Sequence, residues 1–140
     1  MQSEQKLSLS LKLVSTSTKT PIYKLIIDDV DCTNLGRVKD DHVLYSISRK
    51  EFKTIKVILL NKEPFDTVVI DNKIVEDLMV IIDGLSIDNI SLYNELSKIS
   101  VYKDLQDKIW QTNGYITFNG CMTIKIHKNL LYTKWLAGIM

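Results

Sequence analysis

The chain has 140 residues, of which 45% are apolar, and its net charge at pH 7 is +1. This length suits one domain with a single core, and the five glycines and two prolines exclude collagen-like and linker-rich chains. A charge so close to zero argues against a dedicated polyanion binder, because phosphate binding needs several cations at once. No apolar run reaches the roughly 18 residues that span a bilayer, and no secretory leader begins the chain, so we expect a protein that is soluble when made.

The near-neutral total hides a segregated charge pattern. Residues 49–62 carry five basic residues and one acidic residue, and residues 63–95 carry eight acidic residues and one lysine. Residues 96–140 carry six lysines and two aspartates. Charges separated on this scale can form opposed faces, one suited to anions and one suited to a basic partner. The alternative is a set of solvated loops whose charges interleave in space.

Strand patterns dominate the first half of the chain. A flexible end is expected at residues 1–6, and leucines then alternate with polar residues as in a half-buried strand. Strands are predicted over five segments: 7–17, 22–30, 42–48, 54–60 and 65–71. The apolar run 74–85 does not distinguish a strand from a helix, because short apolar runs suit both.

From Asp88 onward the apolar residues recur at steps of three and four, which predicts a central helical segment around 88–111. Asp88 or Asn89 can cap its start, and "TNG" at 112–114 can end it. The alternative is two helices broken near Ser100, where β-branched neighbours lower helix propensity.

The last part of the chain returns to strand over 115–127, with Asn119-Gly120 as its strongest hairpin signal. The apolar tail at 130–140 can cover the core, pack on another subunit or touch a membrane surface. No internal repeat is visible. Together the segments predict one α+β domain over 7–140 that is mainly β, with antiparallel sheets and the central helical segment.

Catalytic motifs are absent from the sequence: it has no phosphate-binding loop, nucleophile elbow or paired zinc motif. Cys121 and His127 share a strand face but lie about 20 Å apart along it, too far for a catalytic dyad. Cys32 and Cys121 lack the spacing of a disulfide framework, which indicates a reducing compartment. We therefore expect no enzyme, no cofactor and no metal site.

Basic residues close together in the sequence form the candidate anion site. They are predicted to bind RNA or phospholipid: Arg49, Lys50, Lys53 and Lys56. Phe52 among them can stack on a base or sit in a headgroup layer, and its burial in the core is the alternative. Because nothing here specifies bases, binding would depend on charge and fall with salt.

Two stretches, "SVYKD" at 100–104 and "PIYKLIIDDV" at 21–30, resemble the matrix protein of bornaviruses, which are negative-strand RNA viruses. The second stretch matches the spacing of an early strand in that family at Pro21, Leu25, Ile27, Asp28 and Val30. The resemblance implies a mainly β, sandwich-like matrix fold that forms homo-oligomers, commonly tetramers. It also implies contact with the anionic inner surface of a host membrane and non-specific binding of single-stranded RNA or the nucleocapsid. Such a protein is located in the virion and in the host cytoplasm or nucleus.

We therefore predict a viral matrix protein that self-assembles, binds the inner membrane leaflet and engages RNA during virion assembly. Contacts with another subunit or with a membrane are predicted for four residues, with core packing as the alternative: Tyr102, Trp110, Trp135 and Leu136. The alternative function is a small β-rich viral or virulence protein that binds one host protein in immune evasion. That protein would use Tyr102, Trp110 and the acidic block 63–95.

Overall fold

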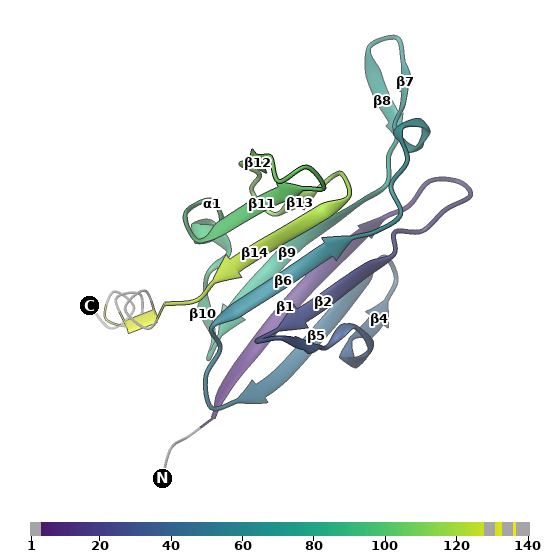
Figure 1. Ribbon diagram of the computed structural model, residues 1–140. Helices are drawn as coiled ribbons and strands as arrows, with labels where there is room; N and C mark the ends of the chain where they lie inside the picture. Colours follow the sequence, from purple (N-terminus) through teal and green to yellow (C-terminus); the bar gives the residue numbers. More distant parts are fainter. Residues whose placement is uncertain (1–3, 128–130, 133–135, 137–140) are drawn as a thin grey trace.

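A computed structural model describes residues 4–127, 131, 132 and 136, and these form two six-stranded antiparallel sheets and a separate two-stranded hairpin (Figure 1). Sheet A consists of β1 (Gln5–Val14), β4 (Arg37–Lys39), β5 (His42–Arg49), β9 (Met79–Ile87), β10 (Ile90–Ser91) and β13 (Tyr115–Ile116). Sheet B consists of β2 (Tyr23–Ile27), β3 (Val30–Asp31), β6 (Thr54–Leu59), β11 (Ser100–Asp104), β12 (Ile109–Trp110) and β14 (Gly120–Lys125). The remaining elements are β7 (Val68–Ile70), β8 (Lys73–Glu76), the single helical turn α1 (Leu96–Ile99), and the 3₁₀ turns Thr33–Leu35, Pro64–Asp66 and Tyr93–Glu95.

The two sheets pack face to face and share one core. Side chains alternate along β1, so that Leu7, Leu9 and Leu11 are buried while the residues between them face outward. The same alternation in β5, β6 and β14 supplies side chains from both sheets to a single buried cluster. The prediction of a mainly β chain with antiparallel sheets is confirmed. β1 already begins at Gln5, inside the segment predicted to be flexible.

The two sheets have the same strand order, which reveals an internal duplication. Sheet A runs β10-β9-β1-β5-β4, and sheet B runs β3-β2-β6-β14-β11 before ending in β12. The first unit consists of β1 to β5. The second unit consists of β6, β9, β10, β11 and β14, which correspond in chain order to the five strands of the first. Each unit places one hairpin, β2–β3 or β9–β10, in the sheet built by the other unit. No repeat is visible in the sequence, and the repeat lies in the order in which the strands pair.

Two-residue turns close these exchanged hairpins and the β7–β8 hairpin. The turns are Asp28-Asp29, Asp71-Asn72 and Asp88-Asn89, and φ is positive at all six positions, between 48° and 65°. Asp and Asn tolerate this left-handed region because their short polar side chains can hydrogen-bond locally, and the tightest β-hairpins require it. None of these three turns was predicted from the sequence.

The first aspartate of each exchanged hairpin clamps the turn to the first strand of a unit. Asp28 accepts the backbone N–H of Thr54 at 2.8 Å, and Asp88 accepts that of Lys6 at 2.8 Å. In return, the N–H of Asp28 donates to the carbonyl of Thr54 at 3.0 Å, and that of Asp88 to the carbonyl of Lys6 at 2.9 Å. The duplication therefore extends to individual hydrogen bonds.

The helical segment predicted around 88–111 is wrong except for one turn. Asp88-Asn89 forms a hairpin turn and not a helix cap, and the chain is a strand again from Ser100. Two β-branched residues flank Ser100, and such residues favour a strand. The apolar spacing was misleading because Tyr102 enters the core from a strand, whereas Leu105 is 78% exposed. Among the described residues, no helix is long and apolar enough to cross a membrane.

The hairpin predicted at Asn119-Gly120 is also wrong. β13 pairs with β9 in sheet A, whereas β14 pairs with β6 and β11 in sheet B, so the chain crosses between the sheets here. Asn119 accepts the N–H of Lys62 at 2.7 Å and donates to its carbonyl at 2.9 Å. Gly120 permits a close approach of two strands, because a Cβ at this position would lie 2.3 Å from the carbonyl oxygen of Lys103.

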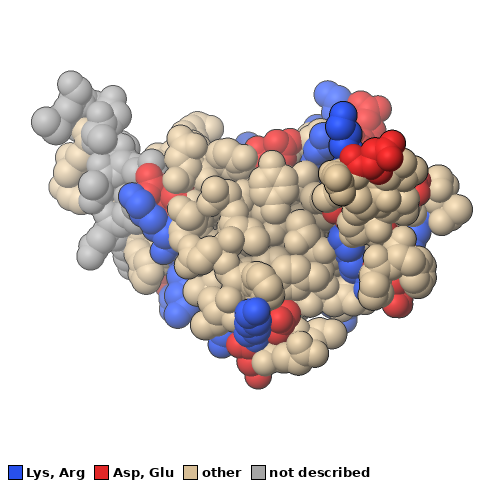
Figure 2. All heavy atoms as spheres, turned by 90° about the horizontal axis from the view of Figure 1, so that it is seen from above, with Lys and Arg blue, Asp and Glu red and all other residues tan. Residues whose placement is uncertain are grey.

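The exposed apolar side chains of the described residues include two groups outside the core. The β7–β8 hairpin projects from the body of the molecule (Figure 1), and the large apolar side chains on it and at its base are more than half exposed: Phe65, Val69, Ile70, Ile74 and Val75. The second group, here called the apolar edge, comprises Leu105, Ile109 and Trp110 on and beside β12. Seen from above the view of Figure 1, the centre of the molecule is mostly uncharged, and charged side chains lie toward its margins (Figure 2). Exposed apolar surfaces of this kind are typical of contacts with another protein.

Replacing Asp88 by alanine is expected to lower the free energy of unfolding by about 2 kcal/mol. The variant loses the acceptor for the N–H of Lys6 and places alanine at a φ of 51°, where it is strained. Asp88→Gly removes the same acceptor without the strain, so we expect it to cost about 1 kcal/mol. Urea denaturation measures both variants, and equal losses would contradict the role assigned to the left-handed turn.

Candidate functional site

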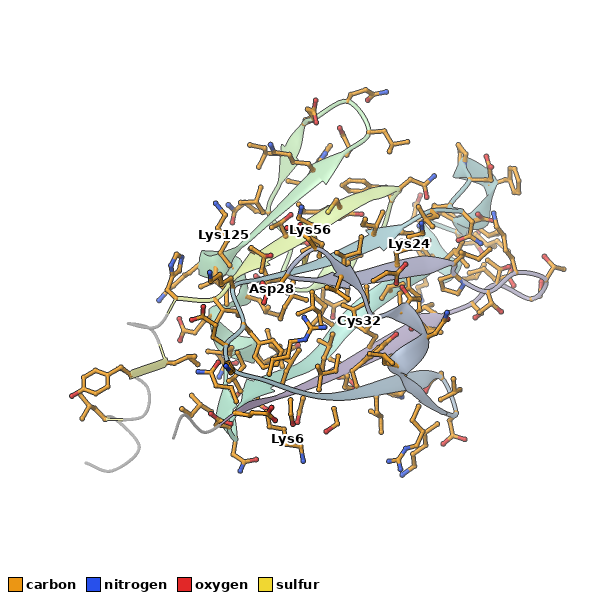
Figure 3. All side chains as sticks on the ribbon, turned by 60° about the horizontal axis from the view of Figure 1, so that its bottom comes forward. Lys6, Lys24, Asp28, Cys32, Lys56 and Lys125 are labelled. Atoms are coloured by element: carbon orange, nitrogen blue, oxygen red, sulfur yellow. The ribbon has the colours of Figure 1, made fainter. Side chains whose placement is uncertain are left out.

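The outer face of sheet B carries lysines on four adjacent strands. Because side chains alternate along a strand, the residues between the core positions of β2, β6, β14 and β11 point away from the core. The lysines among them form what is here called the lysine face: Lys24, Lys56, Lys125 and Lys103. Figure 3 shows Lys24, Lys56 and Lys125 on the neighbouring strands β2, β6 and β14.

Uncharged side chains separate these lysines across the sheet. Lys56 lies opposite Ile26 of β2 and Thr123 of β14, and Lys103 lies opposite Cys121. Carboxylates lie beside these rows. Asp28 is hydrogen-bonded to Thr54, which is opposite Lys125. Asp107 lines the same hollow as Lys56 and Lys103. The face offers its charges together with aliphatic surface.

The four lysines are not ion-paired. In the part of the chain that the structure describes, none of them has a carboxylate oxygen within 4.0 Å, whereas Lys19 and Lys62 elsewhere are paired. Asp31 on the edge strand β3 is held by Thr33, whose hydrogen bonds lower the pKa of that carboxyl, and the charge of Lys24 adds to the effect. An unpaired ammonium keeps its charge available to an external anion.

The carboxylate of Asp104 at the end of β11 is used within the connection between β11 and β12. It accepts the indole N–H of Trp110 at 3.1 Å and the backbone N–H groups of Gln106 and Lys108, both at 2.9 Å. These hydrogen bonds, led by that of Trp110, lower the pKa of Asp104. By strand alternation Asp104 lies on the Tyr102 side of β11, the side opposite to Lys103, so this carboxylate is not part of the lysine face.

Arg49, which was predicted to contact phosphate, is occupied inside the molecule. Its guanidinium donates to the carbonyl oxygen of Ile27 at 3.0 Å and to Sγ of Cys32 at 3.3 Å. Arg49 lies at the end of β5 in sheet A, whereas Ile27 belongs to sheet B. Its contacts therefore tie the two sheets together.

The other residues of the predicted anion site do not converge. Lys56 lies on the lysine face, Lys50 is exposed after the end of β5, and Lys53 pairs with Glu51 at 3.4 Å. Phe52 is buried in the core, which was the alternative to stacking. Lys24, Lys103 and Lys125 were missed because they are far from Lys56 in sequence, and only strand pairing brings them together.

Tyr102, which was predicted as a contact residue, is a core residue. It is 1% exposed, its ring stacks on Phe118 with 4.4 Å between centroids, and its hydroxyl donates to the carbonyl of Phe118. Burial raises the pKa of the Tyr102 hydroxyl to about 12. Core packing, the alternative for this residue, is what the structure shows.

Trp110 is 40% exposed on the apolar edge and is available for a contact. Its ring meets Phe118 edge-on at 5.4 Å, and the ammonium of Lys108 lies 4.2 Å from its centroid. Leu136 is half-buried, and Trp135 lies outside the described residues. Among the predicted contact residues that the structure describes, Trp110 is exposed, Leu136 is half-buried and Tyr102 is buried.

His42 is held at both ring nitrogens and has neither free for catalysis. Its Nδ1 lies 2.7 Å from Asp41 and its Nε2 lies 2.6 Å from Asp83. A general base needs a nitrogen facing the nucleophile, and here carboxylates occupy both positions. Within residues 4–127, 131, 132 and 136, no three His, Cys, Asp or Glu side chains group as metal ligands.

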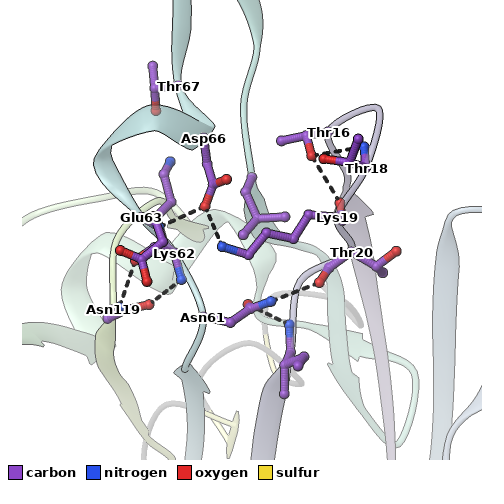
Figure 4. A network of polar contacts seen from close by, with 12 residues as sticks. Thr16, Thr18, Lys19, Thr20, Asn61, Lys62, Glu63, Asp66, Thr67 and Asn119 are labelled. Carbon is purple, nitrogen blue, oxygen red and sulfur yellow. Dashed lines mark hydrogen bonds and ion pairs between the residues drawn. The ribbon is translucent and has the colours of Figure 1, made fainter.

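A polar network fastens the base of the β7–β8 hairpin to the body of the molecule (Figure 4). Lys19 donates to the buried carboxylate of Asp66 at 2.8 Å. Asn61 donates to the carbonyl of Thr20 at 3.0 Å and accepts the N–H of Ile22 at 2.7 Å. The hairpin is therefore anchored at its base while its apolar strands stay exposed.

No family model, curated protein or solved structure matches this chain. The lysine face, with its unpaired cations, and the exposed apolar surfaces are thus the features from which a function can be argued.

Proposed function

We propose that this protein is a structural, matrix-type viral protein that lies with its lysine face against the anionic inner leaflet of a membrane. The strongest support is the set of four lysines on adjacent strands, none of them ion-paired among the described residues. Each lysine near an anionic membrane surface contributes about 1 kcal/mol, so four together contribute about 4 kcal/mol. All four point away from the same sheet face, so one surface can meet them together.

The composition of the lysine face favours a membrane over single-stranded RNA. Proteins that bind single strands without sequence preference stack the bases on aromatic side chains. The outward residues of β2, β6, β14 and β11 include lysines and aliphatic residues, and none of these positions is aromatic. Non-specific RNA binding, which the bornavirus resemblance implies, would use the same charges without the stacking.

Self-association through the apolar edge is the second part of this function. Leu105, Ile109 and Trp110 expose apolar surface beside the short edge strand β12. A second copy that covers this edge would bury that surface and protect the unpaired strand edge. In a homo-oligomer the lysine faces repeat, so their attraction to the membrane adds up.

Binding of one host protein through the β7–β8 hairpin is the second candidate function. Both strands of this hairpin expose apolar side chains, and a two-stranded sheet has free edges to which a partner strand can pair. Such a protein would be a monomer or dimer and would not bind anionic vesicles.

Liposome flotation tests the membrane function. Wild type is expected to float with phosphatidylserine vesicles at low salt and to be released at about 1 M salt, where the Debye length is about 3 Å. Lys56→Gln/Lys125→Gln removes two charges from the lysine face. We expect it to lower the partition coefficient roughly thirtyfold, because each lysine contributes about 1 kcal/mol.

Lys6→Gln/Lys39→Gln is the matched control, because it removes two exposed lysines from sheet A and leaves the lysine face intact. This control should float like wild type. Equal losses in both variants would assign binding to net charge rather than to one face, and no flotation of wild type would overturn the proposal. Short single-stranded RNA, titrated in parallel, shows whether the same lysines bind nucleic acid, and light scattering gives the oligomeric mass.

A further inference from the structure

A hollow of about 800 Å³ lies on the outer face of sheet A, on the opposite side of the body from the lysine face. Its floor contains serines in register on four adjacent strands. The row is Ser91 of β10, Ser86 of β9, Ser8 of β1 and Ser46 of β5. We call this hollow the serine trough.

Small side chains create the serine trough, and larger ones wall it. Ser10 and Gly84 continue the floor in the next row, where β-branched residues would be more usual on a solvent-facing strand. Tyr93 stands at the β10 end, and Leu35 and Arg37 stand at the β4 end. Four strand spacings separate these ends, so the trough is about 19 Å across.

The polar groups of the trough are without partners in the region that the structure covers. No hydrogen bond is made there by the hydroxyls of Ser8, Ser10, Ser46, Ser86 and Ser91. Arg37 forms no ion pair there, whereas the one carboxylate of the lining, Asp83, is held by His42 at 2.6 Å. Each hydroxyl can donate and accept, and Arg37 offers five N–H donors to an anion.

We infer that the serine trough binds an acidic oligosaccharide. A peptide strand would need free backbone groups, but three of the four floor strands, β9, β1 and β5, are already paired on both sides. An apolar helix would bury the serine hydroxyls without partners, which is unfavourable. A nucleic acid needs several cations, and the lining offers Arg37 alone.

A chain of sugar rings suits each feature of the trough. Its hydroxyls match the serine floor, and the length of the floor fits several rings rather than one. Tyr93, 40% exposed, offers an aromatic face on which a ring can pack. A carboxylate on one sugar would pair with Arg37 in the bidentate geometry that guanidinium favours. The trough and the lysine face lie on opposite sheets, so this binding is independent of membrane contact.

Titration of the ¹⁵N-labelled full chain with 3′-sialyllactose, a trisaccharide with one carboxylate, tests the inference by NMR. Saturable shifts are expected at the amides of the trough residues. Ser46→Val should lower the affinity at least tenfold by filling the floor, while Ser48→Val, on the same face of the same strand but outside the trough, should leave it unchanged. Both variants keep a good strand former, so the fold is retained.

The carboxamide of the same trisaccharide isolates the contribution of the acid. Arg37→Gln should weaken binding of the acid about tenfold, to the level of the carboxamide, because one charge-assisted contact is lost. Three results would overturn the inference: no saturable shifts with either sugar, shifts confined to the lysine face, or equal losses in Ser46→Val and Ser48→Val.

Discussion

Leu25→Ala is expected to lower the free energy of unfolding by about 4 kcal/mol. Leu25 is fully buried on the inner face of β2, opposite Val57 of the neighbouring strand β6. Removing its branched end loses apolar burial and leaves a cavity that the paired strands cannot close, and leucine-to-alanine changes of this kind cost about 3–5 kcal/mol. Urea denaturation measures the loss as a lower midpoint at unchanged slope.

The internal duplication supplies the matched comparison. Leu85 holds the equivalent position in β9 and is 3% exposed, so Leu85→Ala should cost about as much as Leu25→Ala. Ile26→Ala alters the next residue of β2, which is half-buried on the outer face, and should cost only about 1 kcal/mol. A similar loss for Ile26→Ala and Leu25→Ala would contradict the assignment of the core face.

The exchange of hairpins explains why the two units depend on each other. β9 lies between β1 and β10, and β2 lies between β6 and β3, so each sheet contains strands from both halves of the chain. Neither half alone can complete a sheet, and the strand edges left open would be prone to unwanted pairing. Folding must therefore bring together residues as distant as Lys6 and Asp88 before either sheet is complete.

Alternating strands could be predicted from the sequence, whereas the central segment could not. Along β1 and β6 every second residue is apolar, and this period is the direct consequence of one buried face. The segment 88–111 shows apolar steps of three and four by coincidence, because a hairpin turn, a 3₁₀ turn, an α-helical turn and the three strands β10, β11 and β12 lie there. Asn119-Gly120 has the strongest hairpin composition, yet tertiary pairing overrides it, while the weaker Asp88-Asn89 pair forms the turn.

The lysine face depends on the register in which distant strands pair, and no local sequence pattern indicates that register. Lys56 and Lys125 meet on one face because β6 pairs with β14, and no local pattern indicates that pairing. Arg49 and Lys53 are close to Lys56 in sequence but are separated from it by their contacts with Ile27, Cys32 and Glu51. The same reason hides the serine trough, because its serines come from strands that are far apart along the chain.

Asp77→Ala is expected to lower the free energy of unfolding by about 3 kcal/mol. The carboxylate of Asp77 forms an ion pair with Lys62. It also accepts hydrogen bonds from the hydroxyl of Thr67 and the N–H of Leu78, both at 2.8 Å. The Lys62 and Asp77 side chains are only 10% and 11% exposed. Without Asp77, the ammonium of Lys62 would be left nearly buried and unpaired, which is strongly unfavourable.

Lys62→Met/Asp77→Leu is the control that separates an unpaired charge from lost packing. It removes both charges and keeps the volume, so its cost should be about 1 kcal/mol or less. If the double variant lost as much stability as Asp77→Ala, packing at the base of the hairpin would explain the effect and the ion pair would not.

The pH dependence of the free energy of unfolding tests independently whether Asp77 stabilises the fold through its charge. Burial alone would raise the pKa of Asp77, but hydrogen bonds from Lys62, Thr67 and Leu78 outweigh it and hold the pKa below its ordinary value of 3.8. A carboxyl with a lowered pKa in the folded state stabilises the fold fully above about pH 4, and this contribution is lost as the pH falls through the folded-state pKa. The stability gap between wild type and Asp77→Ala should therefore be constant near neutral pH and narrow below about pH 4, since the other carboxyls titrate alike in both proteins. A gap that stayed constant down to about pH 2 would mean that Asp77 contributes through its shape and not through its charge.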